Sequence, residues 1–294
     1  MKTTSVAAVL SAALLLVSCA GQKKPENGGA VDKGNKRAQA AQMKGAPSDF
    51  KPAAGDENIK NSEVAYNLAL EYAGKGEMPA AHHYIDLAII LQPDSKYSYT
   101  KGLFLLGDKR YDEALVWLER SLQQGPGTSD NKLAVQNALG ATYMQLGQDE
   151  KALAQFREVV NAPGIVSRYE SYYNMGIIYL RQQKWLDAEA VFQKVVEENP
   201  GYYRAYGKLG LISAHKEDWG QAALLYKRAL DLIQNDYPAL QTDGAELYCN
   251  YGEALFHEKL YPESRQALMQ VLRISPESSA GQKAKEILAK LGSP

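Results

Sequence analysis

The chain has 294 residues, of which 45% are hydrophobic and 23% charged, and this composition excludes disorder throughout. Its formal net charge of -1 argues against nucleic acid as a partner, because phosphate binding needs a concentrated excess of Lys and Arg. Cys19 and Cys249 are the only cysteines, so at most one disulfide could form and no disulfide framework holds the fold.

The amino terminus carries an apolar stretch at residues 6–17, after Lys2. These 12 residues are too few for the ~20 that span a bilayer as a helix, and they are typical of the hydrophobic region of a secretory signal peptide. The closing residues, Leu16 to Cys19, resemble the lipobox of bacterial lipoproteins. The resemblance implies that residues 1–18 are a lipoprotein signal peptide, that lipid is attached to Cys19, and that the new amino terminus is acylated. Soluble secretion is the alternative, although an A-x-A-like cleavage site is poorly formed here.

The lipid expected on Cys19 would anchor the protein to a membrane. Each buried CH₂ contributes about 0.8 kcal/mol and a single myristoyl chain binds only marginally, so three acyl chains together make a durable anchor. Ala20 stands where the inner-membrane retention signal of the family would place Asp. The resemblance therefore implies the outer membrane, at its periplasmic face. We expect no cofactor besides this covalent lipid.

Residues 19–61 are predicted to form a lipidated flexible tether. After the cysteine, the segment is rich in Gly, Lys, Ala, Asn, Gln and Pro and shows no sustained helical period. Its 42 residues would span roughly 35 to 40 Å as a random coil. The tether would let the folded part of the chain stand off the membrane. Its eight Lys and Arg outnumber five Asp and Glu, which allows contact with anionic lipid or glycan, although a solvated tether is the simpler interpretation.

From residue 62 onward the sequence repeats a pattern of paired helices. The clearest copy has its characteristic residues at helical spacings: Tyr172, Met175, Gly176, Tyr179, Ala188, Phe192, Val195 and Pro200. This pattern resembles the tetratricopeptide repeat, a unit of 34 residues that forms two helices joined by a turn. With the small residue of each copy set at its eighth position, six repeats begin near Ser62, Ser95, Leu133, Tyr169, Tyr203 and Ala245.

Each repeat supplies the residues that a close helix crossing needs. The eighth position is small in every copy: Ala69, Gly102, Gly140, Gly176, Gly210 and Gly252. The twenty-fourth position is bulky: Ile85, Leu118, Phe156, Phe192, Tyr226 and Leu268. A small residue lets two helix axes approach, and a bulky one fills the gap beside it. We therefore expect an all-α fold, and the resemblance implies a right-handed superhelical solenoid with a concave face. A non-repetitive helical bundle is the alternative.

Helix ends are marked by proline, which lacks the N–H group that a helix interior uses. Prolines stand where the second helices should stop: Pro93, Pro126, Pro163, Pro200 and Pro276. The fifth repeat lacks this proline, and we expect a longer connection at residues 233–244 instead. The six repeats are predicted to occupy residues 62–278. Residues 279–294, with Ala284, Ile287 and Leu288 on one face, are predicted to form a capping helix and tail.

The sequence offers no pattern that indicates catalysis, and we do not expect an enzyme. The four histidines form no ligand set with carboxylate or cysteine at metal spacing. Cys249 lies inside a predicted helix without an identifiable base, as a packing residue would. The segment "GPGTSD" at residues 125–130 lacks the Lys-Ser/Thr of a phosphate loop and is predicted to be an inter-repeat loop. We therefore expect no catalytic residue, no metal site and no small-molecule substrate.

In the repeat family that this sequence resembles, the concave groove is lined mainly by positions 2, 5, 9 and 12 of each first helix. Positions five and nine assign a protein-binding groove here to Tyr66, Leu70, Tyr99, Leu103, Asn137, Tyr173, Ile177 and Leu211. Tyrosine suits an interface, because it combines a large apolar body with one polar handle and loses little rotamer entropy. The hypothesis is that the groove accepts an extended or amphipathic protein segment. The alternative role of any one of these residues is packing between neighbouring helices.

The lipobox, the tether and the six repeats together resemble the outer-membrane pilotin lipoproteins of type IV pilus systems (PilF/PilW type). The resemblance implies binding to secretin subunits, which the protein would help to reach or assemble in the outer membrane. One feature departs from that family, whose repeats usually begin soon after the lipid, whereas 42 residues intervene here. The alternative function is an adaptor that recruits periplasmic proteases or cell-wall enzymes.

Overall fold

The computed structural model describes residues 55–163 and 168–292, and within these ranges every element is helical. The predicted signal peptide, Cys19 and most of the predicted tether lie outside the described residues. The chain divides into two compact units at residue 164. We call the described residues 55–163 the N-terminal unit and residues 168–292 the C-terminal unit. In neither unit is any helix long and apolar enough to cross a membrane.

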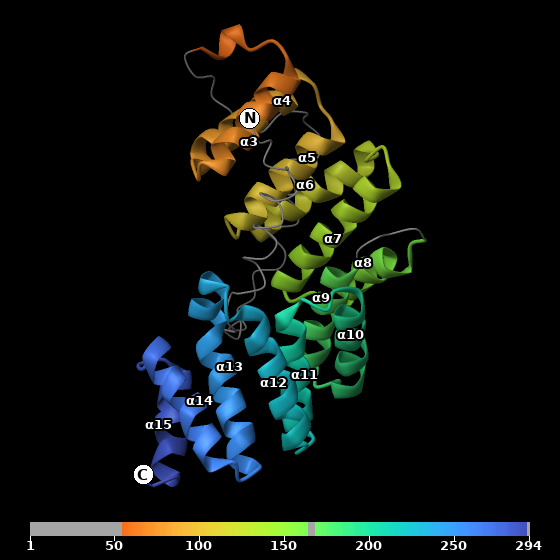
Figure 1. Ribbon diagram of the computed structural model, residues 1–294. Coiled ribbons are helices and arrows are strands. Elements are labelled where there is room, and N and C mark those ends of the chain that lie inside the picture. Colours follow the sequence, from red (N-terminus) through yellow and green to blue (C-terminus); the bar gives the residue numbers. More distant parts are fainter. Residues whose placement is uncertain (1–54, 164–167, 293–294) are drawn as a thin grey trace, which may run out of the picture. The chain divides into compact units, whose positions relative to one another are not determined.

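The N-terminal unit consists of a short 3-10 helix and three helical hairpins, which Figure 1 shows in orange to green. The 3-10 helix η1 (Asp56–Asn58) precedes the first hairpin. The three hairpins are α3 (Ser62–Gly74) with α4 (Met78–Leu91), α5 (Ser95–Gly107) with α6 (Tyr111–Gln124), and α7 (Ser129–Gln145) with α8 (Asp149–Asn161).

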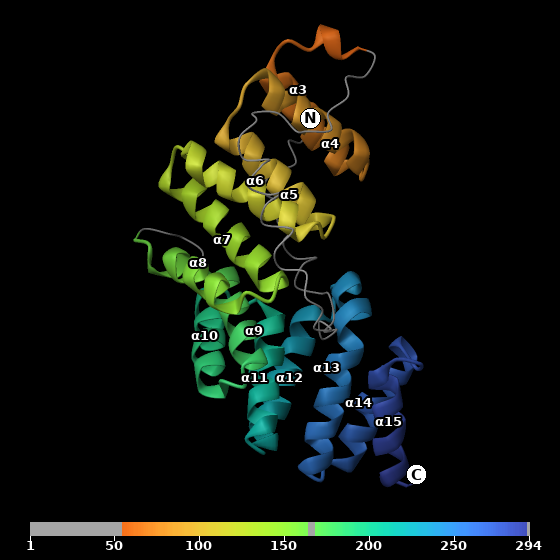
Figure 2. The ribbon, with the colours of Figure 1, turned by 180° about the vertical axis from the view of Figure 1, so that it is seen from behind.

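The C-terminal unit consists of three further hairpins and a last helix, and Figure 2 shows them from behind. The hairpins are α9 (Tyr169–Arg181) with α10 (Trp185–Glu198), α11 (Tyr203–His215) with α12 (Trp219–Ile233), and α13 (Tyr237–His257) with α14 (Tyr261–Ile274). The last helix, α15 (Ser279–Lys290), buries Ala284 and Ile287 in a cluster with residues of α13 and α14. Lys283 of α15 is also paired with Glu253 of α13 at 2.6 Å.

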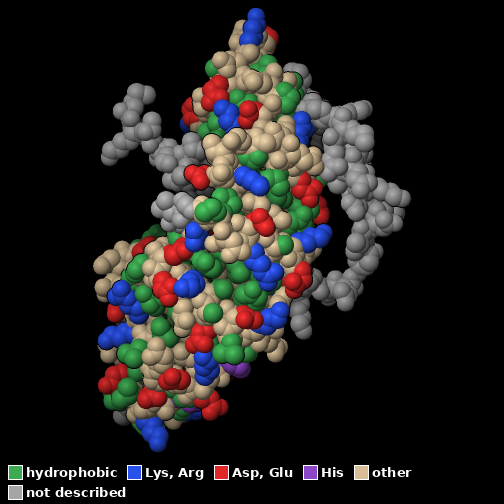
Figure 3. Space-filling model, turned by 90° about the vertical axis from the view of Figure 1, so that its right-hand side faces the viewer, with side chains coloured by type: hydrophobic (Ala, Val, Ile, Leu, Met, Phe, Trp, Pro, Cys, Tyr) green, Lys and Arg blue, Asp and Glu red, His purple; other side chains and the backbone are tan. Residues whose placement is uncertain are grey.

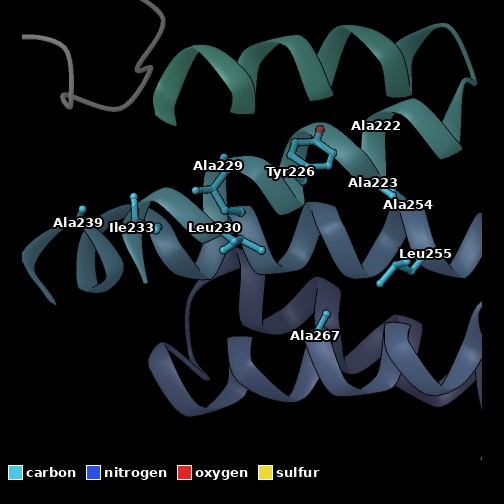
Figure 4. Packing of buried hydrophobic residues seen from close by; sticks show 11 residues of the cluster. Ala222, Ala223, Tyr226, Ala229, Leu230, Ile233, Ala239, Ala254, Leu255 and Ala267 are labelled. Atoms are coloured by element: carbon cyan, nitrogen blue, oxygen red, sulfur yellow. The ribbon is translucent and has the colours of Figure 1, made fainter. Parts of the chain in front are cut away.

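The close helix crossings expected at the eighth position are confirmed. A Cβ atom added to Gly176 would lie 2.6 Å from the ring of Phe192, and one added to Gly140 would lie 2.6 Å from the ring of Phe156. The same conflict arises at Gly102, Gly210 and Gly252 with their own partners at position twenty-four. Figure 4 shows Tyr226 of α12 among the buried residues of its cluster. A Cβ atom added to Gly210 would lie 2.8 Å from the ring of Tyr226. The glycines therefore allow each hairpin to close at its crossing point.

The turn inside each hairpin uses the same backbone geometry. One residue of every turn has a positive φ: Gly76, Lys109, Gly147, Gln183, Glu217 and Lys259. In the first hairpin the N–H of Gly76 donates to the carbonyl of Ala73, the N–H of Glu77 donates to that of Tyr72, and the same two bonds recur in the other five. This is the Schellman arrangement, which satisfies carbonyl groups left open at a helix end. Four of the six turns achieve it without glycine.

One expected connection was wrong. The connection predicted at residues 233–244 is mostly helix, since α13 begins at Tyr237 and its cap residue Asp236 accepts from the N–H of Ala239 at 3.1 Å. Pro238 is compatible with this start, because the first turn of a helix does not use the N–H that proline lacks. Helix α7 begins at Ser129, ahead of the repeat start that was placed near Leu133. The prolines expected after second helices do follow the ends of α4, α6, α8, α10 and α14.

The surface carries charges of both signs. On the face shown in Figure 3, Lys and Arg side chains are interspersed with Asp and Glu. This distribution agrees with the net charge of -1 for the whole chain. On that face, no broad field of one sign would attract a highly charged polymer.

Candidate functional site

A pocket of about 350 Å³ lies in the N-terminal unit, at the amino-terminal ends of α5 and α7. Each of the three first helices of the unit contributes to it, together with the loop between α6 and α7. Tyr66 comes from α3, Tyr99 from α5 and Ala134 from α7. We call it the tyrosine pocket. Its volume lies at the lower end of the range of ligand sites, and is enough for one or two side chains of a bound segment.

Tyr66 forms one wall of the tyrosine pocket and is held by charged and aromatic neighbours. Its ring lies 5.1 Å from that of Tyr97, and the Lys96 ammonium lies 5.2 Å from the Tyr66 ring centroid. Lys96 in turn donates to Glu63 at 2.5 Å, and this bond lowers the pKa of the Glu63 carboxyl. The Tyr97 hydroxyl donates to Ser62 at 3.2 Å. The Tyr66 ring therefore packs against Tyr97 and Lys96, which are themselves bonded to α3.

The lining near the start of α5 is rigid and polar. Ser95 donates its hydroxyl proton to the carbonyl of Ser121 at 2.9 Å, and Ser121 donates to the carbonyl of Ser95 at 2.8 Å. Asp94 caps α5 by accepting from the N–H of Lys96 at 2.8 Å. Thr100 donates to the carbonyl of Lys96 at 2.9 Å. Because these groups already bond within the protein, a bound segment would be held mainly by the apolar and aromatic walls.

The loop between α6 and α7 forms the rim of the tyrosine pocket. Gly125 and Gly127 both have positive φ angles, of 79° and 81°, which glycine adopts without strain. Pro126 lies between them, and its carbonyl accepts from the Asn131 side chain at 3.0 Å. A Cβ atom added at either glycine would meet nothing within 4 Å, so the rim is open. The predicted inter-repeat loop at residues 125–130 is confirmed over residues 125–128, whereas Ser129 and Asp130 already belong to α7.

The structure places the eight residues predicted for the groove in different environments. Tyr66 and Tyr99 line the tyrosine pocket, while Leu70 and Asn137 are half-buried elsewhere in the same unit. Leu103 is fully buried against Leu118 and offers no surface to a partner. The prediction that Leu103 lines the groove was wrong. It is a core residue, because position nine of this helix points between neighbouring helices.

The C-terminal unit holds the remaining three predicted groove residues. Tyr173 is buried, and its ring packs 5.6 Å from Phe192 and 5.2 Å from Tyr202, so it too is corrected to the core. Ile177 is half-buried beside the same cluster. Leu211 is exposed. A groove role for Ile177 and Leu211 stays a prediction.

Some residues of the tyrosine pocket were missed by the sequence reasoning. Lys96 and Ala134 stand at position two of their repeats, which belongs to the groove positions of the resembling family but was left out of the assignment. That signal could have found them. Ser121 and Gly125 come from the end of a second helix and the loop after it, where no repeat position points to a binding role.

Groups that could carry chemistry are few in the described ranges. No three His, Cys, Asp or Glu side chains of residues 55–163 and 168–292 lie close enough together to hold a metal ion. Cys249 is buried between α13 and its neighbours, and this burial raises the pKa of its thiol. A thiol held protonated in the core is a poor nucleophile.

Comparisons with known proteins point to one repeat family. Models of the tetratricopeptide repeat match residues 95–162, 173–237 and 245–278. The solved structure of PilF from Pseudomonas aeruginosa superposes with a TM-score of 0.65 at 15% identity, covering 80% of this chain and 99% of that one. That of PilW, described as a type IV pilus biogenesis factor, has a TM-score of 0.64 at 17% identity, covering 76% and 98%.

A further similar structure is the C-terminal part of a tetratricopeptide-repeat protein from Cytophaga hutchinsonii. It has a TM-score of 0.57 at 14% identity, and covers 95% of this chain and 99% of that one. At such identities these structures show a shared fold. No curated protein sequence matches the chain.

Proposed function

The chain belongs to the tetratricopeptide-repeat family, and from this premise we propose that its N-terminal unit binds an extended segment of a partner protein at the tyrosine pocket. Membership of this family supports a scaffold that binds protein partners. The tyrosine pocket is proposed as the binding site because three successive first helices, α3, α5 and α7, contribute side chains to it.

The shape of the pocket favours a protein segment as the ligand. Successive repeats present equivalent faces at regular steps, so an extended segment can contact several repeats at once. Tyr66 and Tyr99 offer aromatic surface, and Ala134 and Val135 leave room beside them. An apolar side chain of the segment would occupy the pocket, while its backbone would run past the open rim at Gly125 and Gly127.

The test is capture of partner proteins by the purified full chain. Replacement of Tyr66 and Tyr99 by Ala removes both aromatic walls, and truncation of such anchor residues costs about 2 kcal/mol or more, equal to roughly a 30-fold loss of affinity. Tyr237→Ala is the matched control, because Tyr237 is exposed and lies in the C-terminal unit. Circular dichroism would verify that all variants fold. Undiminished capture by the double variant would exclude the tyrosine pocket as the binding site.

We further propose that lipid on Cys19 anchors the protein at the periplasmic face of the outer membrane, where it assists type IV pilus assembly by binding secretin subunits. The lipobox and the shared fold with PilW and PilF support this proposal. Capture of the native lipoprotein from cross-linked envelopes should yield secretin, and Cys19→Ser should release the protein from the membrane fraction. Recovery of periplasmic proteases or cell-wall enzymes in place of secretin would favour the alternative adaptor function.

A further inference from the structure

Four titratable side chains form a continuous chain between α4 and α5, where the first repeat meets the second. Nε2 of His82 lies 2.7 Å from Oδ2 of Asp108, and Nδ1 of His82 lies 3.2 Å from Nζ of Lys101. Nζ of Lys101 also donates to Oδ2 of Asp86 at 2.9 Å. Two of these residues belong to α4, while Lys101 lies in α5 and Asp108 caps its end. The chain therefore joins the two repeats through polar contacts.

The centre of this chain is shielded from water. The side chains of Lys101 and Asp86 are 9% and 14% exposed, that of His82 is 16% exposed, and that of Asp108 is 32% exposed. The His82 ring also meets the ring of Phe104 edge-on, with the centroids 5.6 Å apart. The contact between His82 and Lys101 therefore lies in a medium that screens charge weakly, whereas Asp108 is closer to solvent.

Among the described residues, the charged groups that act on His82 come from α4, from α5 and from the residue that caps α5. Lys101 and Asp108 face it from α5, and Asp86 lies one turn along its own helix. The neighbouring His83 points elsewhere, with Nε2 bonded to the carboxylate of Asp56 in η1 at 2.9 Å. His82 and His83 are thus adjacent in sequence but belong to separate networks, which makes His83 an internal comparison.

The hydrogen bonds fit one protonation state of His82. A neutral ring with its proton on Nε2 donates to Asp108 and accepts from Lys101 at Nδ1, so both ring nitrogens are satisfied. A protonated ring carries a proton on Nδ1 as well, and that N–H would face the Lys101 ammonium. Protonation therefore removes one buried hydrogen bond and places two positive charges side by side. Burial and then the Lys101 charge lower the pKa of His82, against the opposing pull of Asp108.

We propose that His82 is a proton-sensitive contact, whose protonation loosens α5 from α4 and thereby disturbs the tyrosine pocket. The connection to the pocket runs through α5, because Tyr99 and Thr100 of the lining directly precede Lys101 on this helix. This consequence for binding rests on the proposed function of the pocket. The loosening of the two helices does not depend on it.

The contribution of His82 to the stability of the folded chain depends on pH. Because the pKa of His82 is lowered in the folded state, this group contributes stability at pH values above about 6.5, the ordinary value, and the contribution is lost as the pH falls. Burial raises the pKa of Asp86. The stability contribution of Asp86 is therefore lost as the pH rises, starting near the ordinary pKa of about 3.9, which is opposite to the effect of His82. Between pH 7.5 and 5.5 the His82 contribution should therefore make the contact weaker in acid.

Hydrogen exchange of the full chain in detergent, measured at pH 7.5 and 5.5 and corrected for the intrinsic rates, tests the contact. We expect protection of α4 and α5 to fall in acid, by at most about tenfold between these two pH values, because pH 5.5 lies only one unit below the ordinary pKa of about 6.5. His82→Gln should remove the pH dependence, because its amide donates and accepts without titrating. His83→Gln is the matched control and should behave as the unmodified protein. Equal protection at both pH values, or a persistent dependence in His82→Gln, would overturn the proposal.

A second measurement covers the case in which His82→Gln does not fold. The imidazole signal of His82, followed by NMR in the unmodified chain, should titrate below about 6.5, and Lys101→Met should move the midpoint upward because the ammonium is gone. A midpoint above 6.5 in the unmodified chain contradicts the proposal. Partner capture at pH 7.5 with the Tyr66 and Tyr99 variants decides the pocket function separately, so the two ideas can fail independently.

Discussion

In the N-terminal unit, the second helix of the first repeat meets the next repeat through the charged chain of His82, Lys101 and Asp86. In the C-terminal unit, the corresponding contacts include two aromatic stacks, beside an ion pair of Lys216 and Glu189 at 2.6 Å. Trp185 at the start of α10 stacks on His215 at the end of α11, with ring centroids 3.8 Å apart, and Trp219 stacks on His257 at 3.9 Å. The hairpins themselves are built alike in both units. The repeat pattern therefore does not determine whether charged or aromatic side chains join neighbouring hairpins.

The largest loss of stability is expected at the helix crossings, and it tests whether the two units close their hairpins in the same way. Phe156→Ala and Phe192→Ala each leave a cavity beneath the helix crossing at Gly140 or Gly176, and such truncations of fully buried rings cost about 3 to 5 kcal/mol. Urea unfolding followed by circular dichroism measures the loss. Leu224→Ala, at an exposed position, should change stability by less than about 0.5 kcal/mol. A loss below about 1 kcal/mol for one phenylalanine alone would show that the two units close their hairpins differently.

A smaller change in stability is expected at the turns within the hairpins, where the two units differ in the residue that has a positive φ. The N-terminal unit has glycine in two of its three turns, Gly76 and Gly147, whereas the three turns of the C-terminal unit hold Gln183, Glu217 and Lys259 at positive φ. Gly147→Ala should destabilise by about 1 kcal/mol, since a left-handed conformation is unfavourable for a residue with a Cβ. Gln183→Gly should stabilise by less, because glycine also gains freedom in the unfolded chain. Thermal unfolding checks both, and a lower midpoint for Gln183→Gly would refute the strain argument.

The smallest effect is expected at the aromatic stacks, whose coupling energy can be compared with that of a charged pair. A double-mutant cycle with Trp185→Ala and His215→Ala should give a coupling of about 1 kcal/mol that changes little with salt. The exposed pair of Glu63 and Lys96 in the N-terminal unit should couple by about 0.5 kcal/mol and lose that coupling at high salt. Equal salt responses of the two couplings would contradict the distinction between stacked and charged contacts.

The hairpins were predictable because their residues act at fixed spacings. A glycine at position eight and a ring at position twenty-four, such as Gly176 and Phe192, meet whenever the chain between them forms a helix, a turn and a helix. The start of α13 was not predictable by the same reasoning. A longer connection was expected at residues 233–244, yet Pro238 stands in the first turn of α13, where proline is tolerated, and Asp236 supplies the cap.

The site was predictable only in part, because repeat positions do not state which side of a helix remains uncovered. Tyr66 and Leu103 were both assigned to the groove, but the neighbouring hairpin leaves one in the pocket wall and covers the other completely. The contribution of Ser121 and Gly125 could not be read from a repeat position, since it depends on how one hairpin's end meets the next hairpin's beginning.

The sequence by itself determined the repeated helix pairs and the residues at their crossings, because those contacts join positions a fixed distance apart along one hairpin. Only the tertiary structure decided which side chains line the tyrosine pocket and that His82, Lys101 and Asp108 meet. Those contacts join different hairpins, so they depend on how neighbouring repeats pack, and that packing is set by many side chains together.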